Sequence, residues 1–111
     1  MNDTMVKDIT IKHIINSKIS FINNNTIFDK ENCAYINAGE IDAYKEMLND
    51  IDLLTTDSFV EKYRTKVKCT LNVIDNGKPL SVNETERLSG YNNAIVFILS
   101  LINPIYEFEL N

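Results

Sequence analysis

Apolar residues recur at steps of three and four along this chain, which is the spacing of one face of an α-helix. The strongest signal is an apolar run at residues 94–102 with almost no polar interruption. Ser81 and Glu84 precede it with the spacing of a capping box, in which each side chain bonds the backbone N–H of the other residue. We therefore predict a helix between Ser81 and Pro104. We place it centrally in a bundle, because a surface helix carries only one apolar stripe.

The clearest amphipathic pattern covers residues 38–54. Asn37 and Glu40 repeat the cap spacing at its start, with Asn37 in the capping role. The apolar face of this segment comprises Ile41, Tyr44, Met47, Leu48, Ile51 and Leu54. On the opposite side, three carboxylates at four-residue steps form one line along the helix: Asp42, Glu46 and Asp50. We expect this acidic ridge to face water.

Residues 62–74 fit two patterns. Ser58 and Glu61 give a third cap signature, and the apolar positions that follow, as far as Ile74, keep helical spacing. The same segment also alternates apolar and polar residues, as a half-buried strand does. Its length favours the helix, because strands longer than about ten residues are unusual. Gly77 also fits the end of a helix.

The first apolar stretch, residues 5–22, is rich in isoleucine, and Ile11, Ile15, Ile19 and Ile22 share a helical face. Parts of residues 9–28 also alternate like strands, which β-branched residues favour. We predict a loop or short extended piece at residues 26–36. The chain as a whole is predicted to be one all-α domain over residues 1–111, a bundle of about four helices with short loops. The alternative is an α+β fold with residues 62–74 and part of 9–28 as strands.

At 111 residues, with 44% hydrophobic and 24% charged residues, the chain has the composition of one globular domain. The apolar run is shorter than the ~20 residues that cross a bilayer, and the N-terminal sequence lacks the pattern of a secretory signal. We therefore expect a cytoplasmic protein without membrane contact. In that compartment Cys33 and Cys69 are expected to be free, buried or semi-buried thiols.

The net charge of −5 conceals a segregated pattern. Residues 31–61 carry eight acids against Lys45 alone, whereas residues 62–78 carry five cations against Asp75. An acidic protein repels the phosphate backbone, so we expect no nucleic-acid partner. The simplest use of the basic set is pairing with the acidic neighbouring helix; the set comprises Lys62, Arg64, Lys66 and Lys68.

No residue pattern indicates catalysis or a cofactor. His13, Cys33 and Cys69 lie on separate segments without the spacing of metal ligands. The three glycines form no phosphate-binding loop, and the carboxylates at residues 40–52 lack the shielding that general-acid work requires. We expect no metal, no cofactor and no enzymatic activity, with His13 at the surface or the edge of the core.

One stretch resembles a known group of proteins. Residues 86–95, ERLSGYNNAI, followed by Leu99-Ser100 and Pro104, are similar to the last helix of some immunity proteins of contact-dependent growth inhibition systems. The size, acidity and helical character also resemble colicin immunity proteins. The resemblance implies a bacterial cytosolic inhibitor. Such a protein binds one toxin domain tightly, often a nuclease, and blocks its active site or substrate path.

The charge pattern and the resemblance together give one hypothesis: an immunity protein whose acidic surface covers a basic cleft of its cognate toxin. Tyr35 is the expected aromatic anchor, because Tyr44 lies on the predicted core face. The expected partner-binding residues are Tyr35, Glu40, Asp42, Glu46, Asp50, Asp52 and Asp57. Two alternatives stay open. One is a non-catalytic adaptor or structural subunit that uses the apolar C-terminal helix as its interface, and the other is a small helical enzyme.

Overall fold

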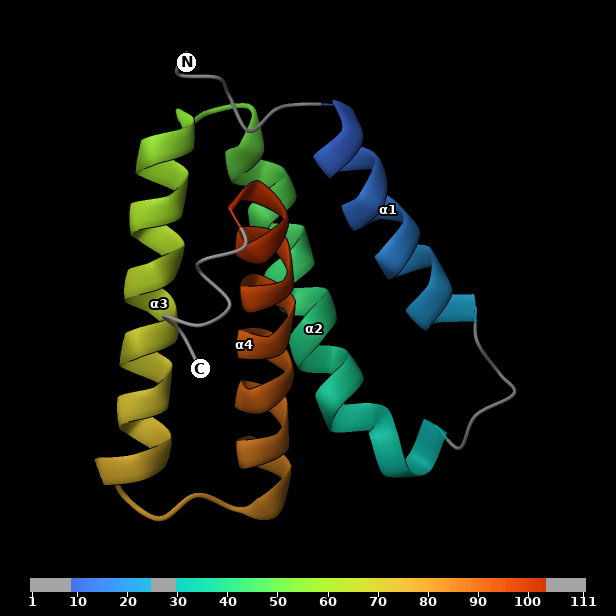
Figure 1. Cartoon of the computed structure of the whole chain (residues 1–111). Helices are drawn as coiled ribbons and strands as arrows, with labels where there is room; N and C mark the ends of the chain where they lie inside the picture. The colour runs from blue at the N-terminus through green and yellow to red at the C-terminus, as the bar shows by residue number, and fades with distance from the viewer. Residues whose placement is uncertain (1–8, 25–29, 104–111) are drawn as a thin grey trace.

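The computed structural model describes residues 9–24 and 30–103 of the chain (Figure 1). These residues form α1 (Ile9–Asn24), α2 (Lys30–Ile51), α3 (Thr56–Asn76) and α4 (Val82–Ile102). No strand occurs within these two ranges, so the all-α bundle is confirmed and the α+β alternative is wrong. α1 and α3 lie on opposite sides of the α2–α4 pair.

α4 is the central helix that its composition predicted, since it packs against both α2 and α3. Ser81 and Glu84 close the capping box with two reciprocal hydrogen bonds of 3.0 Å. The helix ends at Asn103, whose N–H donates to the carbonyl oxygen of Leu99. Its core-facing residues are fully or almost fully buried: Ala94, Ile95, Ile98 and Leu99. The predicted C-terminal piece from Pro104 onward lies outside the described residues.

α2 and α4 approach so closely that their backbones touch at two glycines. A Cβ atom on Gly39 would overlap the carbonyl oxygen of Arg87, and one on Gly90 would overlap the carbonyl oxygen of Ile36. Four residues after each glycine lies a buried alanine, Ala43 in α2 and Ala94 in α4. These small residues form a strip at four-residue spacing on each helix, so the two backbones can meet. Gly90 therefore marks a close crossing of α4 with α2.

α2 begins earlier than the pattern predicted. The predicted loop is wrong from Lys30 onward, and Asn37 lies inside the helix rather than at its cap. The physical reason is tertiary: the backbone of Ile36 contacts Gly90, so α4 supports a turn whose own apolar pattern is weak.

α3 begins at Thr56 and is capped by Thr55, whose hydroxyl accepts a 3.2 Å hydrogen bond from the N–H of Ser58. The cap predicted at Ser58 is therefore wrong by about one turn, because Thr55 offers the same chemistry three residues earlier. The predicted end is confirmed, since the N–H of Gly77 donates to the carbonyl of Val73 at 3.1 Å.

The core lies where the four apolar stripes meet. Its largest fully buried side chains are Ile15, Met47, Ile51, Phe59, Tyr63, Val67, Ile95, Ile98 and Leu99. The predicted faces of α1 and α2 are confirmed, with Ile11 and Tyr44 also buried. The face of α3 is confirmed only as far as Val67, because Leu71, one turn later, is 38% exposed.

Candidate functional site

The acidic ridge of α2 lies at the junction of three helices. Its members follow one another at four-residue steps, as predicted, and each pairs with a cation from α3 or α4: Asp42 with Arg87, Glu46 with Lys66, and Asp50 with Lys62. We call these three pairs the ion-pair row. The expected pairing of Lys62 and Lys66 with the acidic neighbouring helix is thereby confirmed.

The ridge faces water less than expected. The side chain of Asp50 is 16% exposed, whereas those of Asp42 and Glu46 are 44% and 42% exposed. The expectation of a free acidic ridge is therefore wrong for Asp50. The reason is that Lys62 and Tyr63 of α3 lie against Asp50, so a neighbouring helix covers this end of the ridge.

One oxygen of each carboxylate receives the hydrogen bonds in the row. Asp42 Oδ2 accepts from Arg87 Nη2 at 2.6 Å and from Arg87 Nε at 3.0 Å. Glu46 Oε1 accepts the hydroxyl of Tyr91 at 2.7 Å and lies 3.4 Å from Lys66 Nζ. Such bonds fix the carboxylates in orientation, because each is held by charged or hydroxyl donors.

Asp50 is the least exposed member of the row. Its Oδ2 accepts from Lys62 Nζ at 2.5 Å and from the hydroxyl of Tyr63 at 2.6 Å. Burial raises the pKa of Asp50, but the hydrogen bonds from Lys62 and Tyr63 and the charges of Lys62 and Lys66 outweigh it, so the pKa is lowered overall. Asp50 therefore stays ionised and anchors α3 to the end of α2.

Two tyrosines complete the row, although their positions in the sequence predicted only a place on the apolar faces of their helices. Burial, followed by the hydrogen bond to Asp50, raises the pKa of Tyr63. Burial and the hydrogen bond to Glu46 do the same for the pKa of Tyr91. Both phenols therefore remain protonated donors. In the sequence, each of them is a tyrosine on the apolar face of a helix that neighbours an acidic helix. Because a buried phenol usually has a polar partner, that position is the signal that could have indicated the hydrogen bond.

Glu40 lies apart from the row. It is partly buried, and burial raises its pKa while the charge of Lys18 on α1 lowers it. Lys18 itself sits 4.6 Å from the centroid of the Phe97 ring, a cation–π contact that joins α1 to α4. Glu40 therefore belongs to the contact of α2 with α1.

The turn between α2 and α3 carries the most exposed part of the predicted site. Asp52 is 54% exposed and pairs with Lys12 of α1 at 3.1 Å, and Asp57 is exposed in the first turn of α3. Between them Leu53 is 77% exposed. The turn is well defined, because the N–H groups of Leu53 and Leu54 donate to the carbonyl of Asp50 at 2.9 and 3.0 Å.

Tyr35 does not join these groups. It is 42% exposed near the start of α2. The helical residues 36–51 separate it from the turn at Asp52, a distance of about 25 Å at 1.5 Å per residue. The structure therefore divides the seven predicted residues among the ion-pair row, the contact with α1, the α2–α3 turn and an isolated Tyr35.

A pocket of about 400 Å³ opens beside the row, between α3 and the α2–α4 pair. It is lined by Asp42, Thr65, Lys66, Cys69, Thr70, Arg87, Leu88 and Tyr91. Cys69 is a free, exposed thiol, so its expected burial is wrong. The cations of the pocket already pair with acids of the row, and the pocket has no unpaired charge at its base.

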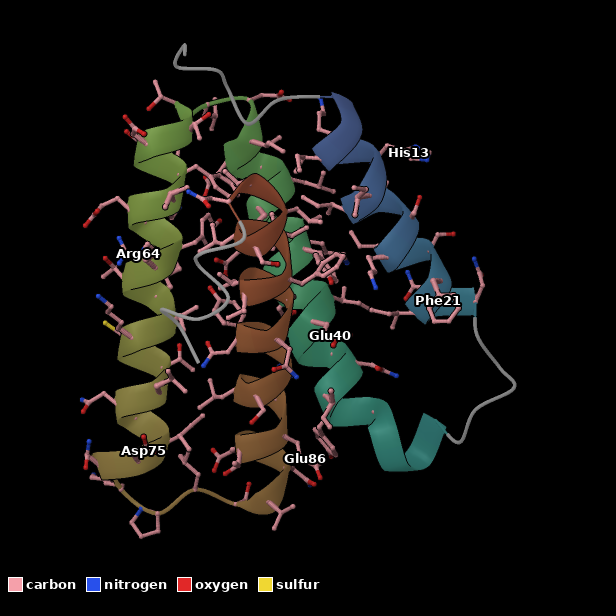
Figure 2. All side chains as sticks on the ribbon, viewed as in Figure 1. His13, Phe21, Glu40, Arg64, Asp75 and Glu86 are labelled. Atoms are coloured by element: carbon pink, nitrogen blue, oxygen red, sulfur yellow. The ribbon has the colours of Figure 1, made fainter. Side chains whose placement is uncertain are left out.

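The remaining sequence candidates lie outside any cluster. His13 is exposed, and Figure 2 shows it on the side of α1 that points away from α2. Within residues 9–24 and 30–103, no group of histidine, cysteine and acidic side chains has the arrangement of a metal site. No helix in the same ranges is long and apolar enough to span a bilayer. The side chain of Cys33 lies outside the described part of the chain.

Comparison of the chain with protein-family models, with curated proteins and with solved structures finds no match.

Proposed function

We propose that this chain is a binding protein that neutralises a bacterial toxin domain by covering a basic surface of that domain. The observation that carries the proposal is the α2–α3 turn, where an exposed leucine stands between two exposed carboxylates, Asp52 and Asp57. An apolar anchor with a charged rim is the usual anatomy of a protein interface. The backbone bonds of the turn hold Leu53 in place, which lowers the entropy cost of binding.

The acids of the ion-pair row have a different part in this proposal from the one their sequence suggested. Their charges are compensated by Lys62, Lys66 and Arg87, so they contribute little net field. Two of them, Glu46 and Asp50, fix α3 against α2 and thereby hold the turn between these helices. Asp57 and Glu61 are both exposed on α3 and form no ion pair with another described residue, so they supply the acidic field that favours a basic partner.

Most residues of the apolar run of α4 are buried in the core or pack against it. Ile95, Ile98 and Leu99 are fully buried, and Leu101 is 42% exposed. Val96, Phe97 and Ile102 are partly buried against the same core, so an adaptor interface on this helix would have less apolar surface to use than the apolar run itself suggests.

The test begins with capture of the partner from cells that make this chain, and continues with the purified pair. At a one-to-one ratio the chain should abolish the enzymatic activity of the captured toxin domain. Leu53→Asp should weaken binding by about 30-fold or more, the effect of losing a hot-spot residue. Val82→Asp is the matched control, because Val82 is 73% exposed at the other end of the bundle and should leave binding unchanged.

Two outcomes are informative in opposite ways. If toxin activity is unchanged at stoichiometric excess, the proposed function is wrong. If the toxin is neutralised but Leu53→Asp binds as well as the unaltered chain, the function stands and the contact surface lies elsewhere. Binding should also weaken as salt concentration rises, because the rim of the surface is charged.

A further inference from the structure

We draw no further inference here: the strongest candidate, the pocket between α2, α3 and α4 beside Cys69 and Tyr91, is lined by charged side chains that already pair with acids of the ion-pair row, and nothing in the described residues shows what would fill it.

Discussion

Asn92 is the buried polar residue of the described core. It is 6% exposed, and neither its amide nitrogen nor its amide oxygen has a hydrogen-bond partner there. A buried polar group without a partner costs about 1–3 kcal/mol. We therefore predict that Asn92→Leu, which keeps the number and branching of the side-chain heavy atoms and removes the polar atoms, raises the free energy of unfolding by about 1–3 kcal/mol. Urea unfolding followed by circular dichroism measures the change.

The neighbouring Asn93 provides the control, because it lies in the same helix and is exposed. Asn93→Leu includes the gain in helix propensity that leucine brings anywhere in α4, about 0.5 kcal/mol. Subtracting it isolates the effect of burial. Should Asn92→Leu lower the free energy of unfolding instead, the prediction that the buried amide destabilises the fold would be wrong.

At the scale of elements, the contact between α2 and α4 depends on two glycines. We predict that Gly39→Ala and Gly90→Ala each lower the free energy of unfolding by at least about 2 kcal/mol, the range of over-packed cores. In each case the new Cβ would overlap a carbonyl oxygen of the other helix, and backbone cannot yield as a flexible side chain does. Thermal and urea unfolding of the two variants measure the loss.

Helix propensity alone gives the opposite sign, since alanine is favoured over glycine by about 1 kcal/mol inside a helix. Asn93→Ala tests that expectation at an exposed position of the same α4 and should be neutral or slightly stabilising. Stabilisation by Gly90→Ala would contradict the close crossing of α2 and α4.

The first half of α3 packs more closely against the rest of the bundle than its second half does. Its buried residues are Phe59, Val60, Tyr63 and Val67, all before residue 68, and its ion pairs to α2 come from Lys62 and Lys66. We predict faster amide hydrogen exchange at residues 69–76 than at residues 59–67, because local opening there breaks few buried contacts. Exchange followed by NMR or mass spectrometry checks this. Equal protection along α3 would show that the second half is covered more fully than its exposure indicates.

At the scale of the whole molecule, two carboxyl groups give stability opposite dependences on pH. The pKa of Asp50 is lowered in the folded state, so Asp50 stabilises the fold above its ordinary pKa, and this contribution is lost as the pH falls through the folded value. The pKa of Glu40 is raised by burial, so its ionisation destabilises the fold as the pH rises above its ordinary value.

Asp50→Asn should therefore be least stable, relative to the unaltered chain, near neutral pH, and the gap should close below about pH 3.9. Glu40→Gln should gain stability relative to the unaltered chain as the pH rises from about 4. Urea unfolding between about pH 2.5 and pH 7 measures both, and each variant serves as the control for the other. Parallel curves for the two variants would show that neither pKa is shifted as described.

The features that the sequence revealed are those decided within a few residues. The bonds of the Ser81–Glu84 box are local, and so is the stripe that buries Tyr44, Met47 and Ile51. The box suggested at Ser58 looked the same, but Thr55 took the cap because the turn after α2 ends there. The choice between two hydroxyls three residues apart depends on a turn that the periodic pattern does not describe.

The direction of the acidic ridge was not predictable from periodicity, which counts large apolar residues as the buried face. α2 has a second buried face made of Gly39 and Ala43. A pattern based on large apolar residues does not include such small residues. The ridge next to them therefore appeared to face water. Arg87 and Tyr91 come from α4, and a sequence pattern gives no measure of how two separate helices are placed.

The contact between α2 and α4 also constrains how the chain is made. The pair of Asp42 and Arg87 joins residues 45 positions apart, and α3 lies between them in the sequence. At about 5–20 residues per second, a ribosome takes roughly 3–10 s to proceed from the end of α2 to the end of α4. During that time α2 exposes its glycine strip and apolar face without the helix that covers them. Until α4 has been synthesised and covers α2, the nascent chain exposes surface that chaperones can bind and that can aggregate.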